Sequence, residues 1–368
     1  MSRSKIYLVA GARPNFMKVA PIIRALKARP ERFEWRLVHT GQHYDREMSG
    51  VFFEELGIPQ PDFHLDAGGG THAEQTGRIM IEFERVCRDD PPDHVLVVGD
   101  VNSTLACSIT AKKQGISLSH VEAGLRSFDR AMPEEINRLV SDAISDWFFC
   151  TEKAGVDHLL REGKSPEFVF FVGQVMVDTL HYERAKLDEM KDVALSSTTF
   201  KRRFGRYGVV TLHRPSNVDH PETLARLATA LKTVSRDLPI IFAAHPRTTK
   251  NLERFGIDLG ENIVITKPLS YVDFLNLWRD AVVVFTDSGG LQEETTALGV
   301  PCLTLRDNTE RPITITEGTN TLVGTDPARI ISEAQDILAG RAKIGQQPQH
   351  WDGNAAIRIV EHLDRLLS

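Results

Sequence analysis

The stretch Thr286–Glu294 carries the clearest chemical potential in this sequence: it follows an apolar run and reads Thr-Asp-Ser-Gly-Gly-Leu-Gln-Glu-Glu. This pattern predicts a strand-to-helix corner, where Gly289 and Gly290 let the backbone approach a ligand closely. The first amides of a helix have no partner within it, so they can bind a diphosphate, and Glu294 can accept sugar hydroxyls one turn later. The alternative is structural: Ser288 caps the helix, and the acidic residues suit its dipole.

A second glycine turn, Gly11–Lys18, follows the first apolar run and carries two cations, Arg13 and Lys18. Arginine offers a planar fork to phosphate oxygens and lysine a point charge, whereas bare cations at a helix start are disfavoured by the dipole. The turn therefore indicates phosphate binding. Neither a Walker motif nor a Gly-x-Gly-x-x-Gly motif is present, so ATP and nicotinamide cofactors lack support.

Three acidic positions are candidates for proton transfer. Asp100 and Glu122 each close an apolar run, and Glu134 begins a helix-like segment after Pro133. Carboxylates that share a site shift one another's pKa and so separate an acid from a base. The structural alternative stays open, because Glu134 suits a first helical turn and Arg138, four residues later, can pair with it.

Among the histidines, His213 is the best candidate, because it ends an apolar run and is followed by Arg-Pro. There it can make a charge-assisted contact with a phosphate. His43 and His245 lie in predicted loops where an ordinary hydrogen-bonding role suffices. Arg311 adds a cation near the glycine turn of the second half. No group of His, Cys and Asp has metal-ligand spacing, so no metal is expected.

These residues need a scaffold, and the sequence predicts strands alternating with helices in both halves. We expect two Rossmann-like, doubly wound parallel α/β domains facing a cleft, over residues 1–175 and 176–352, with a final helix at 353–368 that packs back on the first. Residues 186–206 are polar and are predicted to be an irregular bridge. In such sheets ligands bind at the carboxyl ends of the strands, where the candidate residues fall.

Composition limits the classes of function. The 368 residues are 41% hydrophobic and 26% charged, with a net charge of −6 and a pI near 6.1. These values do not favour a nucleic-acid or membrane partner. Scattered cysteines and a start without a signal peptide predict a cytoplasmic protein with reduced thiols.

Taken together, the motifs resemble those of the non-hydrolysing UDP-N-acetylglucosamine 2-epimerases over nearly the whole chain. The shared segments are 11–14, 41–43, 99–100, 120–126, 133–138, 213–214, 286–294 and 306–311. The resemblance implies a glycosyltransferase-B type fold, a homodimer, a UDP-sugar substrate and no cofactor.

It also implies a reaction: UDP leaves C1 of the sugar while C2 loses its proton, giving 2-acetamidoglucal, and UDP then adds back with the proton on the other face. On the matching positions, Asp100, Glu122 and Glu134 are the acid–base carboxylates, Arg138 positions them, and His213 assists the diphosphate. The residues matching the UDP site are Arg13, Lys18, Ser288, Gly289, Gly290, Glu294 and Arg311. Gln42, His43 and His245 resemble part of a site for a second, activating UDP-N-acetylglucosamine.

Departures from the usual bacterial pattern, at Ala12, Asn15 and Pro215, fall around the sugar. They leave open a modified sugar, such as a UDP-diacetamido-glucuronate. A hydrolysing epimerase that releases UDP, a glycosyltransferase and a catalytically silent sugar-nucleotide binder are further alternatives.

Overall fold

The computed structural model describes residues 3–41, 53, 57–190 and 195–368. The chain divides into two compact units, one formed by Met1–His181 with Gln349–Ser368 and the other by Tyr182–Pro348. The division falls inside helix α7 (Val175–Glu189), whereas the sequence places the boundary after residue 175, where that helix begins.

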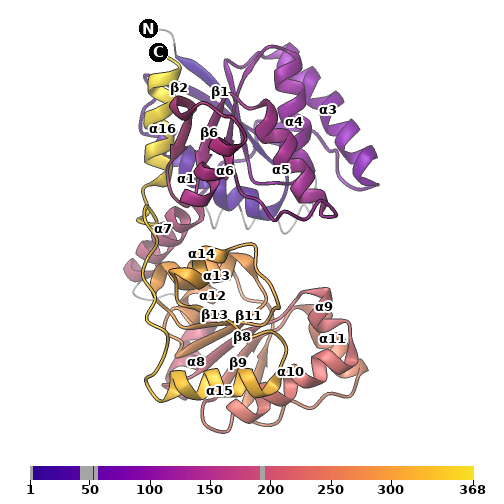
Figure 1. Ribbon diagram of the computed structural model, residues 1–368, viewed down its shortest axis with the longest axis vertical. Coiled ribbons are helices and arrows are strands. Elements are labelled where there is room, and N and C mark those ends of the chain that lie inside the picture. The colour runs from indigo at the N-terminus through magenta and orange to yellow at the C-terminus, as the bar shows by residue number, and fades with distance from the viewer. Residues whose placement is uncertain (1–2, 42–52, 54–56, 191–194) are drawn as a thin grey trace. The chain divides into compact units, whose positions relative to one another are not determined.

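The first unit is built on a seven-stranded parallel sheet with the order β3-β2-β1-β4-β5-β6-β7. Its strands are β1 (Ser4–Ala10), β2 (Phe33–His39), β3 (Phe63–His64), β4 (His94–Val98), β5 (Ser117–Val121), β6 (Trp147–Cys150) and β7 (Val169–Phe171). The helices are α1 (Arg13–Lys27), α3 (His72–Asp89), α4 (Asn102–Lys113), α5 (Pro133–Ile144), α6 (Lys153–Arg161), the short η1 (Pro166–Phe168), the beginning of α7 up to His181, and α16 (Ala355–Leu366). Helix α16, drawn in yellow in Figure 1, packs against α1 although the two lie at opposite ends of the chain.

The second unit repeats this plan with a six-stranded parallel sheet, in the order β10-β9-β8-β11-β12-β13. Its strands are β8 (Gly208–Thr211), β9 (Ile240–Ala243), β10 (Ile263–Thr266), β11 (Val283–Thr286), β12 (Cys302–Thr304) and β13 (Asn320–Leu322). Its helices are α8 (Ser196–Phe204), α9 (Pro215–Val218), α10 (Pro221–Val234), α11 (Pro246–Arg254), α12 (Tyr271–Trp278), α13 (Gly289–Leu298), α14 (Pro312–Thr316) and α15 (Pro327–Leu338). The predicted pair of doubly wound parallel sheets is thus confirmed.

Each sheet has a point where the strand order reverses, between β1 and β4 in the first unit and between β8 and β11 in the second. Loops leaving such a pair of strands turn to opposite faces of the sheet, which opens a crevice at the carboxyl ends. The glycine turns at Gly11 and Gly289 follow β1 and β11. Both therefore lie at a reversal point.

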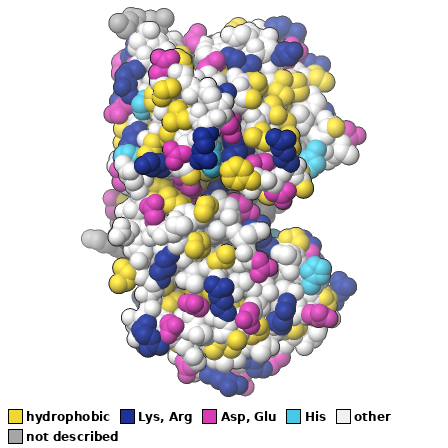
Figure 2. All heavy atoms as spheres, viewed as in Figure 1, with side chains coloured by type: hydrophobic (Ala, Val, Ile, Leu, Met, Phe, Trp, Pro, Cys, Tyr) yellow, Lys and Arg dark blue, Asp and Glu magenta, His cyan; other side chains and the backbone are white. Residues whose placement is uncertain are grey.

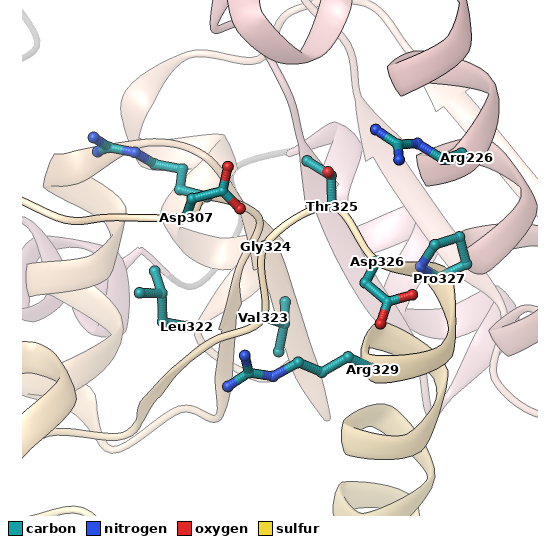
Figure 3. A pocket seen from close by; sticks show the side chains of 10 residues that line it. Arg226, Asp307, Leu322, Val323, Gly324, Thr325, Asp326, Pro327 and Arg329 are labelled. Atoms are coloured by element: carbon teal, nitrogen blue, oxygen red, sulfur yellow. The ribbon is translucent and has the colours of Figure 1, made fainter.

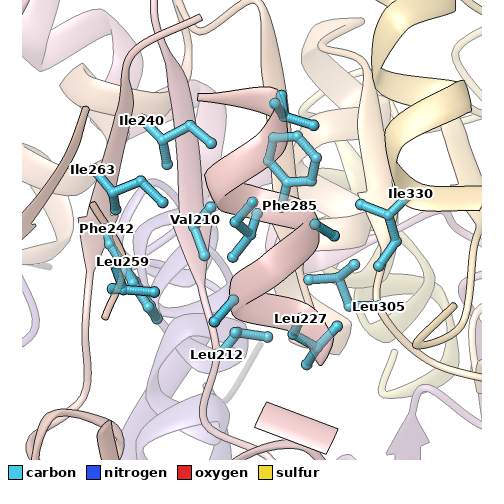
Figure 4. Close-up of a cluster of buried hydrophobic side chains, with 14 of the residues drawn as sticks. Val210, Leu212, Leu227, Ile240, Phe242, Leu259, Ile263, Phe285, Leu305 and Ile330 are labelled. Carbon is cyan, nitrogen blue, oxygen red and sulfur yellow. The ribbon is translucent and has the colours of Figure 1, made fainter. Parts of the chain in front are cut away.

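Buried aliphatic and aromatic side chains hold each sheet against its helices. In the second unit, Val210 of β8 and Phe285 of β11 pack with Leu227 of α10 and Ile330 of α15, and all four are fully buried (Figure 4). Burial of such side chains is the main stabilising contribution to a domain of this kind. These cores fix the strand ends from which the polar residues project.

The prediction of an irregular bridge at residues 186–206 is wrong for most of that range, of which residues 191–194 lie outside the described residues. Helix α7 continues to Glu189, and Ser196–Phe204 forms helix α8. The backbone amides of Ser196 and Ser197 donate to the carboxylate of Asp273, which satisfies the start of α8 from a distant helix. Because Asp273 lies far from α8 in the sequence, no local pattern predicts that it caps the start of this helix.

Acidic and basic side chains are interspersed over the face shown in Figure 2. No helix in the described part of the chain is long and apolar enough to cross a membrane.

Candidate active site

At the reversal point of the first sheet, the side chain of Asn15 links the turn after β1 to the end of β4. Its Oδ1 accepts from the backbone amide of Ala12 at 2.9 Å, and its Nδ2 donates to the carbonyl of Val98 at 3.1 Å. The turn after β1 and the end of β4 are thus held by one buried side chain. In the sequence, Asn15 was noted only as a departure from the usual bacterial motif. The contacts of its side chain show that it has a structural role.

Glu122 and Lys18 form a buried ion pair at this place. Lys18 Nζ lies 2.5 Å from Glu122 Oε2, and the two residues are only 7% and 3% exposed. Oε1 of Glu122 is also buried, with no hydrogen-bond partner among the described residues. Glu122 has a φ of +71°, an uncommon conformation for a residue with a side chain. One carboxylate oxygen is therefore fixed and the other is left unsatisfied.

Gly99 makes room for this pair. Its φ is +69°, and a Cβ atom there would lie 2.9 Å from Lys18 Nζ and 3.5 Å from Glu122 Oε2. Only glycine combines this conformation with so close an approach.

Asp100, next in the chain, is oriented by Arg138, whose Nη1 lies 2.6 Å from Asp100 Oδ2. Arg138 also contacts Glu135 Oε2 at 2.6 Å. The pairing of Arg138 with Glu134 that the spacing allowed is not observed, and Glu134 is exposed on the surface of α5. Glu135 is buried instead because it accepts from the backbone amides of Ser127 and Phe128, in the loop before the helix.

Behind these carboxylates lies a buried histidine that the sequence analysis did not select. His120 contacts Asp142 Oδ1 through Nδ1 at 2.7 Å and the Gly99 carbonyl through Nε2 at 2.8 Å. Burial alone would lower the pKa of His120, but Asp142 and the carbonyl of Gly99 raise it. Since both partners are acceptors, each ring nitrogen carries a hydrogen, and His120 braces the Gly99–Asp100 turn.

In the second unit, His213 lies at the end of β8 beside Asp287 at the end of β11. His213 Nδ1 is 2.9 Å from Asp287 Oδ1, and the His213 side chain is 47% exposed while that of Asp287 is fully buried. The prediction that His213 lies at the end of a strand is confirmed. Its pairing with Asp287, 74 positions further along the chain, was not predicted.

The glycine turn opens helix α13 as predicted. Ser288 occupies the N-cap position, and among the described residues its hydroxyl caps none of the first amides. Apart from its chain neighbours and the nearby backbone of α13, a Cβ atom at Gly289 or Gly290 would meet no described atom within 4 Å. The first turn of α13 therefore presents open space and amides suited to an anion.

Glu294 lies on the second turn of α13 and is 6% exposed. Its Oε1 accepts from the hydroxyl of Tyr271 at 2.7 Å. Burial, with a contribution from neighbouring Glu293, raises the pKa of Glu294 to about 7 even though Tyr271 opposes this. Arg311 contacts the residue before Glu294 in the helix, with Nε 3.0 Å from Glu293 Oε1.

The remaining predicted binding residues are less informative. His245 is exposed and caps α11, accepting from the backbone amide of Arg247 through Nδ1 at 3.3 Å. Gln42 and His43 lie outside the described residues, and of Arg13 only the backbone is described. Within the described chain, no group of three or more His, Cys, Asp or Glu residues could hold a metal ion.

Residues 24–364 match the sequence profile of the UDP-N-acetylglucosamine 2-epimerase family. The chain belongs to this family.

Two relatives of this epimerase show how far the likeness extends. The UDP-N-acetylglucosamine 2-epimerase of Methanococcus maripaludis is 41% identical over 367 residues, which cover 97% of each chain. The UDP-2,3-diacetamido-2,3-dideoxy-D-glucuronate 2-epimerase of Pseudomonas aeruginosa is 38% identical over 365 residues, covering 98% of this chain and all of that one.

A solved structure of another family member has the same fold. The UDP-GlcNAc 2-epimerase of Methanocaldococcus jannaschii, solved in complex with UDP-GlcNAc and UDP, superposes with a TM-score of 0.84 at 40% identity. The match covers 98% of this chain and 99% of that one. The family resemblance read from the motifs is confirmed.

The second unit of the epimerase also has a cavity of about 430 Å³ outside the predicted site. Its lining comes from the ends of β12 and β13 and from α10 and α15, and is drawn in Figure 3. The lining residues are Arg226, Arg306, Asp307, Leu322, Val323, Gly324, Thr325, Asp326, Pro327 and Arg329. None of the residues predicted to bind the nucleotide is among them.

Proposed function

We propose that this protein interconverts UDP-N-acetylglucosamine and UDP-N-acetylmannosamine at C2 without hydrolysis. The observation that carries this proposal is Glu122, a buried carboxylate with one oxygen fixed by Lys18 and the other unsatisfied. A general base must be held in place while one oxygen stays available to the proton it removes. Lys18 holds Glu122 in place, and Oε1, which has no other partner among the described residues, is the oxygen that we assign to the proton.

The chemistry explains why several carboxylates are needed. The hydrogen on C2 is not beside a carbonyl, so it leaves only as the C1–O bond to UDP breaks, giving 2-acetamidoglucal. The return step adds UDP at C1 and a proton to the opposite face of C2. Carboxylates in different environments divide such roles, and Glu122 beside Lys18 differs from Asp100 beside Arg138. Exposed Glu134 is the third proposed member of the acid–base group.

We propose that most of the residues that bind UDP lie in the second unit. The first turn of α13 offers open space and amides to the diphosphate, with Ser288, Gly289 and Gly290 at its start. His213 and Arg311 supply charge, and Glu294 accepts ribose hydroxyls. Arg13, in the glycine turn after β1, is a further proposed phosphate contact. Lys18 stays a proposed nucleotide-binding residue, since its pairing with Glu122 is like that of Arg311 with Glu293.

A second candidate substrate is a UDP-2,3-diacetamido-glucuronate. It is favoured by the 38% identity to the Pseudomonas aeruginosa enzyme that bears this name. The proposed chemistry at C1 and C2 is the same for both sugars, so the difference lies in recognition of C3 and C6.

The test is incubation with each UDP-sugar followed by NMR and chromatography of the products, with Glu122→Gln protein as the control for contaminating enzymes. The proposal expects UDP-N-acetylmannosamine without release of free sugar. Free N-acetylmannosamine with equimolar UDP would identify a hydrolysing enzyme, and turnover of the diacetamido sugar alone would favour the second candidate. No turnover of either sugar would overturn the proposal.

We further propose a cytoplasmic homodimer that binds a second UDP-N-acetylglucosamine as activator, with Gln42 and His245 among its contacts. The complex of the Methanocaldococcus jannaschii enzyme with both UDP-GlcNAc and UDP supports a second nucleotide-sugar site. Sedimentation velocity checks the dimer. A sigmoidal dependence of rate on substrate, lost in His245→Ala, checks the activator, and a hyperbolic dependence would contradict it.

A further inference from the structure

The buried carboxylate of Asp287 makes several contacts, and one of them is with the ring of His213. Its carboxylate lies across the β8–β11 reversal point and accepts from the backbone amides of His213, at 3.2 and 3.1 Å, and Arg214, at 3.0 Å. It also accepts from Asn217 Nδ2 at 3.1 Å. The fourth contact is His213 Nδ1, at 2.9 Å.

This environment keeps Asp287 ionised although its side chain is fully buried. Burial alone would raise the pKa of Asp287, but the His213 ring and the amides of His213 and Arg214 lower it. An ionised carboxylate accepts hydrogen bonds and donates none. The hydrogen of the Asp287–His213 contact therefore sits on Nδ1 of the ring.

A fixed hydrogen on Nδ1 determines what the other ring nitrogen can do. In a neutral imidazole one nitrogen donates and the other accepts, so the partner of Nδ1 decides the state of Nε2. When Nε2 also gains a proton, the carboxylate offsets the positive charge of the ring. With 47% of the His213 side chain exposed, the ring is available to a ligand.

Asp287 also joins His213 to the glycine turn. It immediately precedes Ser288 and Gly289, and its own carbonyl accepts from Arg214 Nε at 3.2 Å. The amides at the start of α13 and the ring of His213 thus share one buried anchor.

We propose that Asp287 is a positioning residue of the epimerase: it holds the hydrogen of His213 on Nδ1, so that Nε2 is the nitrogen that takes up a second proton and donates it in a hydrogen bond to the diphosphate as it leaves and returns. This inference rests on the proposed function, in which His213 assists the diphosphate. The role resembles that of the carboxylate behind the histidine of a hydrolase triad, where loss of the charge misplaces the ring hydrogen.

The experiment uses ¹⁵N-histidine-labelled protein, in which NMR reads the protonation of each ring nitrogen, and His213→Gln assigns the signal. The variant is Asp287→Asn, whose amide group can donate to Nδ1 and so permit the other tautomer. The matched control is Asn217→Ala, which removes a hydrogen bond to the same carboxylate and leaves the His213–Asp287 contact. Each variant is assayed for kcat and for UDP affinity.

In wild type we expect neutral His213 to carry its hydrogen on Nδ1. Asp287→Asn should shift hydrogen to Nε2 and lower kcat by roughly 10- to 1,000-fold, with a smaller change in the Kd for UDP. Asn217→Ala should keep the wild-type tautomer and most of kcat.

Hydrogen on Nε2 in neutral wild-type His213 would overturn the inference even if Asp287→Asn fails to fold. So would equal losses of kcat in the two variants, because these would indicate only a structural role. The tautomer is read without substrate, so failure of the proposed reaction is distinguishable from failure of the His213–Asp287 pairing.

Discussion

At the scale of single residues, Lys18 and Glu122 show how the first unit prepares a group for proton transfer. An ion pair this deeply buried is costly to assemble, since both charges lose water. The unsatisfied second oxygen of Glu122 adds to that cost. Such an arrangement is unfavourable for folding alone and is typical of a site shaped for a substrate.

Replacing Glu122 by Gln tests this point. The amide cannot take up a proton, so we expect turnover to fall by at least ~100-fold while UDP still binds. Steady-state kinetics and calorimetry with UDP measure the two effects. Glu84→Gln, at an exposed residue of α3, is the control and should match wild type. Near-normal turnover in Glu122→Gln would remove Glu122 from the mechanism.

Glu294 gives a prediction that depends on pH. Its pKa in the folded protein is about 7, above the usual value of 4.5, so the folded state binds this proton more tightly than the unfolded chain. Stability from this group is present at low pH and is lost as pH rises towards 7. The unfolding free energy of wild type should therefore fall relative to Glu294→Gln, by up to ~3 kcal/mol between pH 5 and pH 8.

Urea denaturation of the ligand-free proteins at several pH values measures this difference. Glu253→Gln, at an exposed residue of α11, should show no such dependence. A constant difference between wild type and Glu294→Gln across the range would show that Glu294 titrates normally.

At the scale of elements, the glycine turn and the strand ends were predictable from sequence, whereas the pairings across them were not. An apolar run followed by Ser288 and two glycines is a local signal for a corner. The choice of Glu135 over Glu134 as partner of Arg138 depends on the loop that folds over α5, which spacing along one helix does not reveal. The His213–Asp287 contact likewise arises only once β8 and β11 become neighbours.

The open space at Gly290 predicts that a substitution there preserves the stability of the protein but weakens its affinity for UDP. Because a Cβ atom there meets no described atom beyond its chain neighbours and the nearby backbone of α13, Gly290→Ala should fold normally, and alanine in a helix is favoured over glycine by roughly 0.5–1 kcal/mol. The same methyl group would occupy the approach of the diphosphate, so UDP affinity should fall by about 10-fold or more.

Gly77→Ala in α3 is the matched control, since its Cβ atom would also meet open space and α3 carries none of the proposed UDP contacts. It should raise or preserve the melting temperature without changing UDP affinity. Unchanged UDP affinity in Gly290→Ala would contradict the assignment of the diphosphate to the start of α13.

At the scale of the whole molecule, two parallel sheets of similar design carry different chemistry at their reversal points. The first presents carboxylates backed by Lys18, Arg138 and His120, and the second presents amides and a histidine backed by Asp287. Alternating strands and helices were enough to predict both sheets. The extension of α7 past residue 181 and the distant cap of α8 were beyond local patterns.

The central claim is that the C2 hydrogen is removed and replaced while UDP leaves and returns. The most direct measurement is NMR of UDP-N-acetylglucosamine incubated with the enzyme in D₂O. We predict deuterium at C2 of both UDP-sugars at equilibrium, without accumulation of free UDP. Epimerised product that retains ordinary hydrogen at C2 would contradict the account.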